Sequence, residues 1–333
     1  MKVQEIDINW NPDLSIYASE SFLKAVGDDY GWLGGFNSSG KLCCILPYTI
    51  IRKAIFSMVR FRIETILIDH EITVEEEKSF LNNVVEYFRT RGADMIIPAT
   101  TNSIFRTYPD GAIAAPYGSY IIDLTKSEEF LWNQMNTTYR KKIRNSLKKG
   151  VEISTGFEYL DESYELLKNA LKVSGVGFMR YKEFKRMISG FGEYVKFFVA
   201  YYQGTLQGCT IFPFSNYSAY SLYGGRIPEA ETGAMNLLNW EAIQQFREHG
   251  VKCFDFVGVR INPEKGSKQE GIMTFKQRFG GSLFQGYMWK YSIRPLKYFV
   301  YAQAVRYVRG GDIVDAECHK LINNDKKIGN ANI

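Results

Sequence analysis

Hydrophobic and polar positions repeat the same order of elements in the two halves of the chain. Each half has two runs of β-forming residues around a polar turn that contains glycine, which predicts a hairpin. A helix with a glycine after its last turn follows, and then a short apolar strand. The hairpin turns at Gly40 and Gly204 lie 164 residues apart, and the helix ends at Gly92 and Gly250 lie 158 residues apart. The paired segments are 32–47 and 197–213, 76–91 and 236–249, and 95–97 and 253–257.

The similar spacing of these elements favours an internal duplication. Because hairpin–helix–strand is a common arrangement, an unrelated recurrence of the same motif is the alternative. Both interpretations predict an α/β (α+β) protein with mixed, mainly antiparallel sheets flanked by helices.

Three further segments have helical periodicity. Apolar residues recur at every fourth position of 127–150, which predicts one helix with a single apolar stripe and basic residues on its other faces. Segments 161–173 and 295–308 are also expected to be helical, and the second of them carries both apolar and basic side chains. The stripe is Leu131, Met135, Tyr139, Ile143 and Leu147, and the basic residues are Arg140, Lys141, Lys142, Arg144, Lys148 and Lys149.

Composition and charge indicate a globular protein without a membrane-spanning segment. Of the 333 residues, 45% are hydrophobic and 23% are charged, as in ordinary globular proteins. The sequence has no apolar run of about 18 residues that would span a bilayer. Glu5 and Asp7 stand where a signal peptide would be apolar, so we expect a cytoplasmic protein. The net charge of +5 fits an anionic substrate but is too small to indicate nucleic-acid binding by itself.

Several common kinds of site are not indicated. The five cysteines form no C-x-x-C pair and the three histidines are isolated, which argues against a metal site and leaves few candidates for a Ser-His-Asp centre. Gly35–Lys41 matches the first seven positions of a phosphate-binding P-loop. Leu42 replaces the Ser or Thr that would hold magnesium, and the segment leads into a predicted strand, so we expect an ordinary turn.

The segment between Cys253 and Gly281 has the largest number of residues that could form a binding or catalytic site. A strand runs out to Gly258, a loop rich in Gly, Pro and Lys follows, and three cations stand close to several glycines. Such a loop could receive an anionic phosphate or a developing oxyanion. The alternative is a surface loop followed by a helix with a Gly-Gly cap. The cations are Lys268, Lys276 and Arg278.

The same region resembles the Fem aminoacyltransferases, which build peptidoglycan cross-bridges. The resemblance is carried by Asp255-Phe256-x-Gly258 and by Gly271-Ile272-x-x-Phe275-Lys276-x-x-Phe279-Gly280-Gly281. It extends over about 118–287 and is weak over the first 117 residues. Four other segments agree: 123–151 with its basic helix, Gly177-Phe178-x-Arg180-x-x-x-Phe184, Ala219–Gly225, and Leu238-x-x-Glu241-Ala242-Ile243.

The resemblance implies two tandem GNAT-like domains. The first would be discontinuous, with residues 1–117 and 288–333, and the second, residues 118–287, would carry the catalytic site. No long heptad-patterned insertion is present, so we expect the compact type without a coiled-coil arm.

The resemblance also implies an amide-forming reaction, in which an amine of a cell-wall precursor attacks the ester carbonyl of an aminoacyl-tRNA. The catalytic pair of the family falls on Phe275 and Lys276, and the lysine would stabilise the oxyanion. Arg180 and Tyr223 fall on positions that hold the uridine-diphosphate precursor, although Tyr223 could equally pack in the core. Phe184 stands where precursor-binding members commonly have Tyr, and Asp255 is read as a buried hydrogen-bonded acid rather than a base. We further assign Arg260, Lys268 and Arg278 to substrate binding.

Three functions remain open at this stage. In the first, aminoacyl-tRNA is the co-substrate, no other cofactor is needed, and Arg140, Lys141, Arg144 and Lys148 face the RNA. In the second, acyl-CoA is the donor for an amino sugar or peptide, with Arg226–Gly233 as its phosphate loop, where two glutamates would repel the pyrophosphate. In the third, the protein is a non-catalytic partner at the inner face of the membrane and 295–309 lies on anionic lipid. Packing of 295–309 on the first domain is the alternative to membrane contact.

Overall fold

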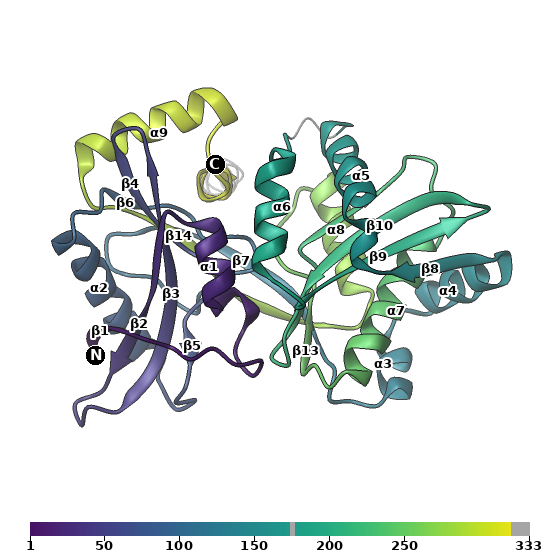
Figure 1. The fold of residues 1–333 in the computed structure, drawn as a ribbon, viewed down its shortest axis with the longest axis horizontal. Helices are drawn as coiled ribbons and strands as arrows, with labels where there is room; N and C mark the ends of the chain where they lie inside the picture. Colours follow the sequence, from purple (N-terminus) through teal and green to yellow (C-terminus); the bar gives the residue numbers. More distant parts are fainter. Residues whose placement is uncertain (174–176, 321–333) are drawn as a thin grey trace, which may run out of the picture.

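The computed structural model describes residues 1–173 and 177–320 as two halves that lie side by side (Figure 1). The N-terminal half contains most of one large sheet, and the other half contains a smaller sheet and most of the helices. The elements of the first half are β1 (Lys2–Ile6), η1 (Ile16–Ala18), α1 (Glu20–Val26), β2 (Asp29–Phe36), β3 (Leu42–Lys53), β4 (Phe56–Phe61), β5 (Ile66–Leu67), α2 (Val74–Thr90) and β6 (Met95–Ile96).

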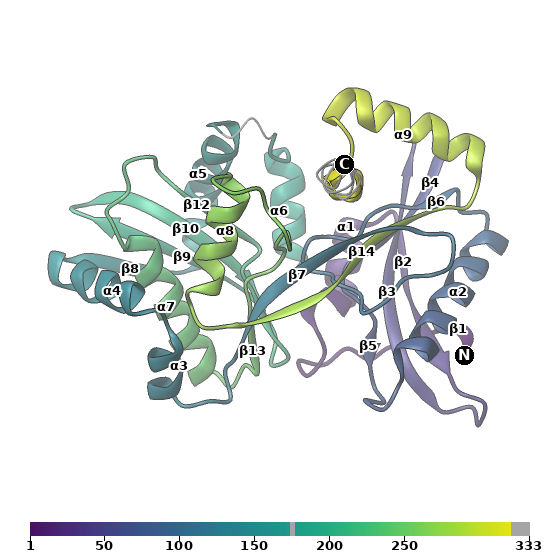
Figure 2. The same cartoon turned by 180° about the vertical axis from the view of Figure 1, so that it is seen from behind.

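Two long strands connect the halves. Within the described chain the large sheet has the order β1-β2-β3-β4-β6-β14-β7-β13-β11, with β5 paired to β3. β7 (Ile113–Asp123) and β14 (Ser282–Ser292) pair antiparallel along most of their length, and β14 also pairs with β6. Figure 2 shows them crossing from one half to the other. The first half therefore holds β13 (Cys253–Asp255) and the loop after it through continuous backbone pairing.

The second half is built on a four-stranded sheet of order β12-β10-β9-β8. Its pairs are all antiparallel, and β4–β6 and β11–β13 are the parallel pairs of the large sheet. The observed fold confirms the predicted mixed α/β class. The remaining elements are α3 (Glu128–Gln134), α4 (Thr137–Lys149), β8 (Val151–Thr155), η2 (Phe157–Tyr159), α5 (Leu160–Val173), α6 (Tyr181–Gly190), β9 (Val195–Tyr202), β10 (Thr205–Pro213), β11 (Ala219–Tyr220), β12 (Tyr223–Arg226), α7 (Ala234–Glu248), α8 (Lys268–Gln277) and α9 (Pro295–Arg309).

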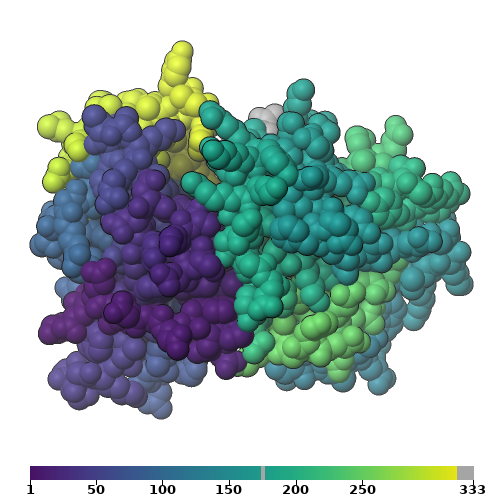
Figure 3. Space-filling model, viewed as in Figure 1, coloured from purple at the N-terminus to yellow at the C-terminus, as the bar shows by residue number. Residues whose placement is uncertain are grey.

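A buried core is shared between the halves. Phe22 of α1 stacks on Phe191 after α6, with ring centroids 4.5 Å apart, and Tyr17 contacts both rings edge-on. The helices approach closely because Gly190 has no side chain: a Cβ there would lie 2.6 Å from the Cβ of Ala25. Aromatic pairs of this kind add about 0.5–1.5 kcal/mol beyond their buried area. The space-filling view shows the resulting continuous seam between α1 and α6 (Figure 3).

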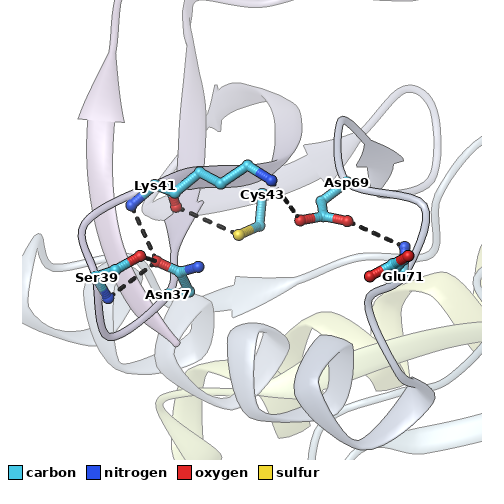
Figure 4. A network of polar contacts seen from close by, with 6 residues as sticks. All are labelled: Asn37, Ser39, Lys41, Cys43, Asp69 and Glu71. Atoms are coloured by element: carbon cyan, nitrogen blue, oxygen red, sulfur yellow. Dashed lines mark hydrogen bonds and ion pairs between the residues drawn. The ribbon is translucent and has the colours of Figure 1, made fainter.

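The P-loop-like segment is the turn between β2 and β3. Figure 4 shows the side chain of Asn37 accepting hydrogen bonds from the Ser39 amide, the Ser39 hydroxyl and the Lys41 amide. Gly40 has φ +80°, a left-handed conformation that glycine adopts without strain. Lys41 forms an ion pair with Asp69 at 2.8 Å, so its ammonium is already engaged. The prediction of a turn leading into a strand is confirmed.

The prediction of one helix over 127–150 is wrong in one respect. Met135 is extended and Asn136 caps a new helix, so α3 and α4 are separate. The Asn136 side chain accepts from the Thr138 amide at 3.0 Å, and the Asn136 amide donates to the carbonyl of Arg278 at 2.9 Å. An Asn cap competes with helix continuation, and here a tertiary hydrogen bond favours the break. Leu147 is 54% exposed and does not extend the buried stripe.

The proposed domain boundaries fall inside β7 and β14, near the pair Tyr117–Gly286. We retain the division into 1–117 with 288–333 and 118–287 as a proposal; residues 321–333 lie outside the described chain. Of the helices formed by the described residues, none is both long and apolar enough to cross a membrane.

Candidate functional site

The candidate catalytic lysine lies in the last turn of α8. Ser267 begins this helix, and its hydroxyl accepts from the Glu270 amide at 3.2 Å. The Lys276 ammonium donates to the carbonyls of Val257 and Gly258, the latter at 2.7 Å. An ammonium has three N–H donors. In the part of the chain that the structure describes, no acceptor takes the third one, so it is available to a ligand.

The carbonyl of Val257 reaches Lys276 because the backbone turns sharply after β13. Val257 has φ +46°, a left-handed conformation that costs a β-branched residue about 1–2 kcal/mol. Its amide donates to Oδ1 of Asp255 at 2.7 Å, while its carbonyl accepts from Lys276. The carboxylate and the ammonium thus hold the two peptide groups on either side of the strained residue Val257.

Burial shifts the pKa values of both Asp255 and Lys276 in the direction that favours the uncharged side chain. Asp255 is buried, and burial raises its pKa to about 6 against the opposing effects of Ser119, the Val257 amide and Lys276. Burial lowers the pKa of Lys276 to about 8, and the charge of Asp255 opposes this shift. Near pH 7 Asp255 is therefore mostly ionised and Lys276 mostly protonated.

Gly258 allows the loop to pass directly against the first half. A Cβ at this position would lie 2.8 Å from the Cβ of Thr101. The Gly258 amide donates to the Thr101 carbonyl at 3.0 Å. The Asp-Phe-x-Gly motif is thus explained by packing: the glycine permits contact, and the aspartate fixes the turn.

Phe275 belongs to an aromatic cluster that joins α8 to α4. Its ring lies 5.9 Å from that of Tyr139 and 5.2 Å from that of Phe279. The guanidinium of Arg278 and the ammonium of Lys142 lie over the Tyr139 ring, at 5.9 and 5.6 Å. The basic helix is therefore fixed next to the end of α8.

The predicted RNA-facing residues form an exposed surface on α4. Lys141, Arg144 and Lys148 are exposed, and Arg140 is half-buried and donates to Asn133 at 3.1 Å. Arg144 lies over the ring of Trp132 at 5.3 Å. No ion pair to a carboxylate involves these four residues within the described chain. Their charges are therefore not neutralised locally.

The N-terminus of α7, where a GNAT domain would hold a CoA pyrophosphate, is covered by α4. The Ser146 hydroxyl donates to the Thr232 carbonyl at 3.1 Å. A Cβ on Gly233 would lie 2.5 Å from that hydroxyl and 2.8 Å from the carbonyl oxygen of Lys142. Glu231, in the same loop, forms an ion pair with Lys149 at 2.6 Å.

The other predicted substrate-binding residues lie in different surroundings. Tyr223 is half-buried, with its ring 5.2 Å from that of Phe178. Arg180 is exposed at the start of α6, and Lys268 and Arg278 are exposed at the two ends of α8. Arg260 forms an ion pair with Glu317 in the C-terminal helical segment 313–320, at 3.0 Å. Of the predicted substrate-binding residues, Arg260 is thus engaged in an ion pair away from Lys276.

Two arginines of the first half were missed by the sequence analysis. Arg60 lies near the end of β4, and Arg62 lies just after this strand. Arg62 is buried and donates to Thr49 at 3.0 Å and to the Val26 carbonyl at 2.7 Å, while Arg60 donates to the Pro98 carbonyl at 3.0 Å. Both are close enough to Tyr223 to lower its pKa, against the larger effect of its burial. The alternation Arg-x-Arg-x-Glu at residues 60–64, at the end of an apolar strand, is the signal that could have found them.

Comparison with known proteins agrees with this geometry. Residues 133–276, which include α4, Asp255 and Lys276, match the family model of the acetyltransferase (GNAT) domain. This match indicates that the chain is an acyltransferase. None of the curated protein sequences compared with this acyltransferase matches it.

Solved structures extend the similarity to nearly the whole acyltransferase. FemX aligns with a TM-score of 0.65 and 14% identity, over 90% of this chain and 99% of its own. The C-terminal domain (DUF2156) of an Agrobacterium fabrum protein described as a lysylphosphatidylglycerol synthetase aligns with a TM-score of 0.54 and 15% identity, over 88% and 92%. A Bacteroides thetaiotaomicron protein of unknown function gives 0.50 and 12%, over 85% and 91%. These likenesses confirm the Fem-type, GNAT-like fold that the sequence predicts.

Proposed function

We propose that this acyltransferase forms an amide bond by moving an aminoacyl group from aminoacyl-tRNA to an amine of a peptidoglycan precursor, nucleotide- or lipid-linked. The observation that carries the proposal is the Lys276 ammonium, fixed by two backbone carbonyls with one N–H uncommitted. Names of structural relatives support an aminoacyl group, since lysylphosphatidylglycerol is a lipid that bears an amino acid.

The reaction needs no side chain that acts as a general base. The acceptor amine attacks the ester carbonyl, a C–N bond forms, and the carbonyl electron pair moves to oxygen. The third N–H of Lys276 stabilises this oxyanion, an effect worth about 3 kcal/mol in comparable sites. Collapse breaks the C–O bond to the ribose, and the proton lost by the amine goes to the ribose oxygen. Metal ions are not required by any of these steps.

The donor is assigned to RNA because of the surface around α4. Exposed, unneutralised Lys141, Arg144 and Lys148 lie on the helix that Tyr139 joins to Phe275. Phosphates bound along α4 would place the acceptor end of a tRNA towards α8. Acyl-CoA remains the alternative donor, but α4 covers the α7 N-terminus that would hold its pyrophosphate, through the contact of Ser146 with Thr232 and the close approach to Gly233.

The acceptor is assigned to the side of α6 and β12. Arg180 and Tyr223 would hold the diphosphate of the precursor, because a guanidinium donates two parallel hydrogen bonds to phosphate oxygens. Lys268 and Arg278 flank the same helix that carries Lys276. Arg260 would first have to give up its ion pair with Glu317.

We also propose that the protein works at the surface of an anionic membrane. α9 packs on the first half through Tyr298 and Tyr301, which confirms that it contacts this half. Five large apolar side chains of this helix are exposed, beside exposed Arg306 and Arg309. An apolar stripe flanked by cations suits an anionic lipid surface. The stripe is Leu296, Phe299, Val300, Tyr307 and Val308.

Thermal unfolding with three ligands tests the donor and acceptor assignments. UDP, UDP-N-acetylmuramoyl-pentapeptide and acetyl-CoA are compared at equal concentrations. A ligand at 100 times its Kd adds about 2.7 kcal/mol to the free energy of unfolding. We expect stabilisation by the two uridine ligands and none by acetyl-CoA. Stabilisation by acetyl-CoA alone would indicate that the donor is an acyl-CoA and not an aminoacyl-tRNA.

A further inference from the structure

Both carbonyl groups that hold Lys276 belong to peptide groups whose N–H is also bonded. The Val257–Gly258 peptide group accepts from Lys276 on its oxygen, and its N–H donates to the Thr101 carbonyl at 3.0 Å. The Gly258–Val259 peptide group accepts from Lys276 at 2.7 Å, and its N–H donates to the Gly118 carbonyl at 2.6 Å. A peptide group is planar, with its oxygen and its hydrogen on opposite sides, so a bond on one side fixes the direction of the other. The carbonyls of Thr101 and Gly118 therefore determine where the two oxygens meet the ammonium.

These two carbonyls are held in different ways. Gly118 lies in β7, whose backbone pairs with β14 along most of its length. Thr101 lies between β6 and β7, in the turn 100–103, which the Ser103 amide closes by donating to the Thr100 carbonyl at 2.8 Å. A turn outside a sheet is not held by a ladder of strand pairs. The position of the Thr101 carbonyl thus depends on what the side chains of this turn contact.

Two side chains of the turn donate to one backbone oxygen of the first half. Thr100 Oγ1 donates to the Arg62 carbonyl at 3.2 Å, and Asn102 Nδ2 donates to the same oxygen at 2.8 Å. Arg62 is itself fixed, because its guanidinium donates to a side chain of β3 and to the carbonyl of the last residue of α1. The turn 100–103 is therefore attached to the first half on both sides of Thr101.

Asn102 makes this bond at a cost to stability. It is 3% exposed, and its Oδ1 has no hydrogen-bond partner in the part of the chain that the structure describes. Native proteins rarely leave a buried polar atom unpaired without a functional reason. The Nδ2 donor, which fixes the turn, supplies such a reason.

We infer that Thr100 and Asn102 are positioning residues for Lys276. They act through the Thr101 carbonyl, which fixes the Val257–Gly258 peptide group and with it one of the two oxygens that hold the ammonium. A hydrogen bond to the N–H also makes the oxygen of the same peptide group a better acceptor. The first half thus takes part in forming the catalytic centre. The importance of this for transfer rests on the proposed function, whereas the fixing of the ammonium does not.

Variants of the two side chains separate positioning from stability. Asn102→Ala removes the donor together with the unpaired Oδ1, and the Arg62 carbonyl keeps the bond from Thr100. The thermal midpoint should therefore stay within a few degrees of that of the native chain. Thr100→Val removes the hydroxyl with little change of shape, and Thr100→Ser retains it and should behave as the native chain does. The Thr100 pair keeps the inference testable if Asn102→Ala fails to fold.

The titration of Lys276 is a measurement that a merely structural role would leave unchanged. It is followed by nuclear magnetic resonance on the full chain with isotope-labelled lysine, and the Lys276 signal is identified by its absence in Lys276→Met. We expect a native pKa of about 8. A displaced carbonyl stabilises the ammonium less, so the pKa of Lys276 should fall in Asn102→Ala and in Thr100→Val.

Asn239→Ala is the matched control. Asn239 is 2% exposed on α7, and its Nδ2 also donates to a backbone carbonyl, that of Met235 at 2.8 Å. Its replacement removes a buried bond of the same kind and should leave the pKa of Lys276 unchanged.

The transfer assay then tests whether positioning matters for the reaction. Asn102→Ala should lower kcat by about tenfold to a hundredfold, since displacements of about 1 Å can have such effects. Both KM values should stay unchanged, because the turn is assigned no contact with a substrate. A raised acceptor KM with unchanged kcat would overturn the inference.

An unchanged pKa of Lys276 in both Asn102→Ala and Thr100→Val would also overturn it, as would an equal fall in Asn239→Ala. Failure of the proposed function is distinguishable. A native chain that transfers nothing, with a Lys276 pKa that falls in Asn102→Ala but not in Asn239→Ala, would contradict the proposed function and support the positioning role.

Discussion

At the scale of single residues, the candidate site depends on one strained residue, Val257. Val257 adopts a left-handed conformation, its amide is held by Asp255 and its carbonyl by Lys276. Lys276 and Asp255 could be selected from the sequence, because the motif around them is specific. The left-handed Val257 could not be, since valine disfavours that conformation and only the tertiary contacts enforce it. The alternation of Arg60 and Arg62 is visible in the sequence, but their contacts with Val26, Thr49 and Pro98 depend on how distant segments of the first half pack.

Replacing Lys276 with methionine should abolish transfer while leaving the fold intact. Methionine keeps most of the side-chain volume and removes the only donor assigned to the oxyanion. We expect the transfer rate to fall by about 10²–10³, with a thermal midpoint within a few degrees of the native chain. Lys265→Met, at an exposed position of the preceding loop, is the control and should retain full activity. A fully active Lys276→Met would contradict the catalytic role.

The pH dependence of transfer should report the coupling of Lys276 to Asp255. Lys276 acts when protonated and its pKa is about 8, so the rate should fall as pH rises through about 8. The negative charge of Asp255 raises that pKa. In Asp255→Asn the fall of the rate on the alkaline side, the alkaline limb of the pH–rate profile, should therefore move to lower pH. Asp123→Asn, at the exposed end of β7, should leave the limb in place. A limb that does not move in Asp255→Asn would show that the aspartate only supports the fold.

At the scale of elements, the helices and hairpins follow the sequence pattern, whereas their interruptions follow tertiary contacts. Both hairpins and the helices at 74–90, 160–173 and 234–248 agree with the prediction within a few residues. The break at Asn136 was missed because the apolar period runs through it without a change. It arises from the hydrogen bond to Arg278, a residue 142 positions away. This bond also places the basic surface of α4 beside the end of α8.

That basic surface should determine affinity for the donor. The triple variant Lys141→Gln/Arg144→Gln/Lys148→Gln should raise the KM for aminoacyl-tRNA at least tenfold at moderate salt. Each lost phosphate contact lowers the slope of log affinity against log salt by about 0.7–0.9, so the slope should fall by about 2–3. Lys78→Gln/Arg89→Gln/Arg91→Gln removes three cations near α2 and is the control for net charge. Equal KM values and slopes in the two triple variants would remove α4 from RNA binding.

At the scale of the whole molecule, two similar units are joined into one body by β7 and β14 and by the shared core at α1 and α6. The repeat of hairpin, helix and strand is visible in the sequence, so the fold class could be predicted. The crossing of β14 back to the first half depends on strand pairing between distant segments, and only the family resemblance suggested it. The exposure of α9 was equally hidden, because a stripe of Leu296, Phe299 and Val300 looks the same whether it is buried or not.

The exposed stripe of α9 should bind anionic bilayers. We expect co-sedimentation with vesicles of phosphatidylglycerol and phosphatidylcholine, and little with phosphatidylcholine alone, because Arg306 and Arg309 contribute electrostatically. Phe299→Ser/Tyr307→Ser should lower the bound fraction at least fivefold. Phe157→Ser/Val173→Ser removes exposed apolar side chains from the other half and is the control. Equal binding by the two double variants would exclude α9 as the membrane contact.

The most direct test of the account is a transfer assay with two labelled donors. Total tRNA charged with labelled amino acids and labelled acetyl-CoA are each offered with UDP-N-acetylmuramoyl-pentapeptide to the native chain and to Lys276→Met. We predict that the label moves from aminoacyl-tRNA to the precursor with the native chain only. Transfer from acetyl-CoA alone, or equal transfer by Lys276→Met, would contradict the assignment of the donor or of the catalytic residue.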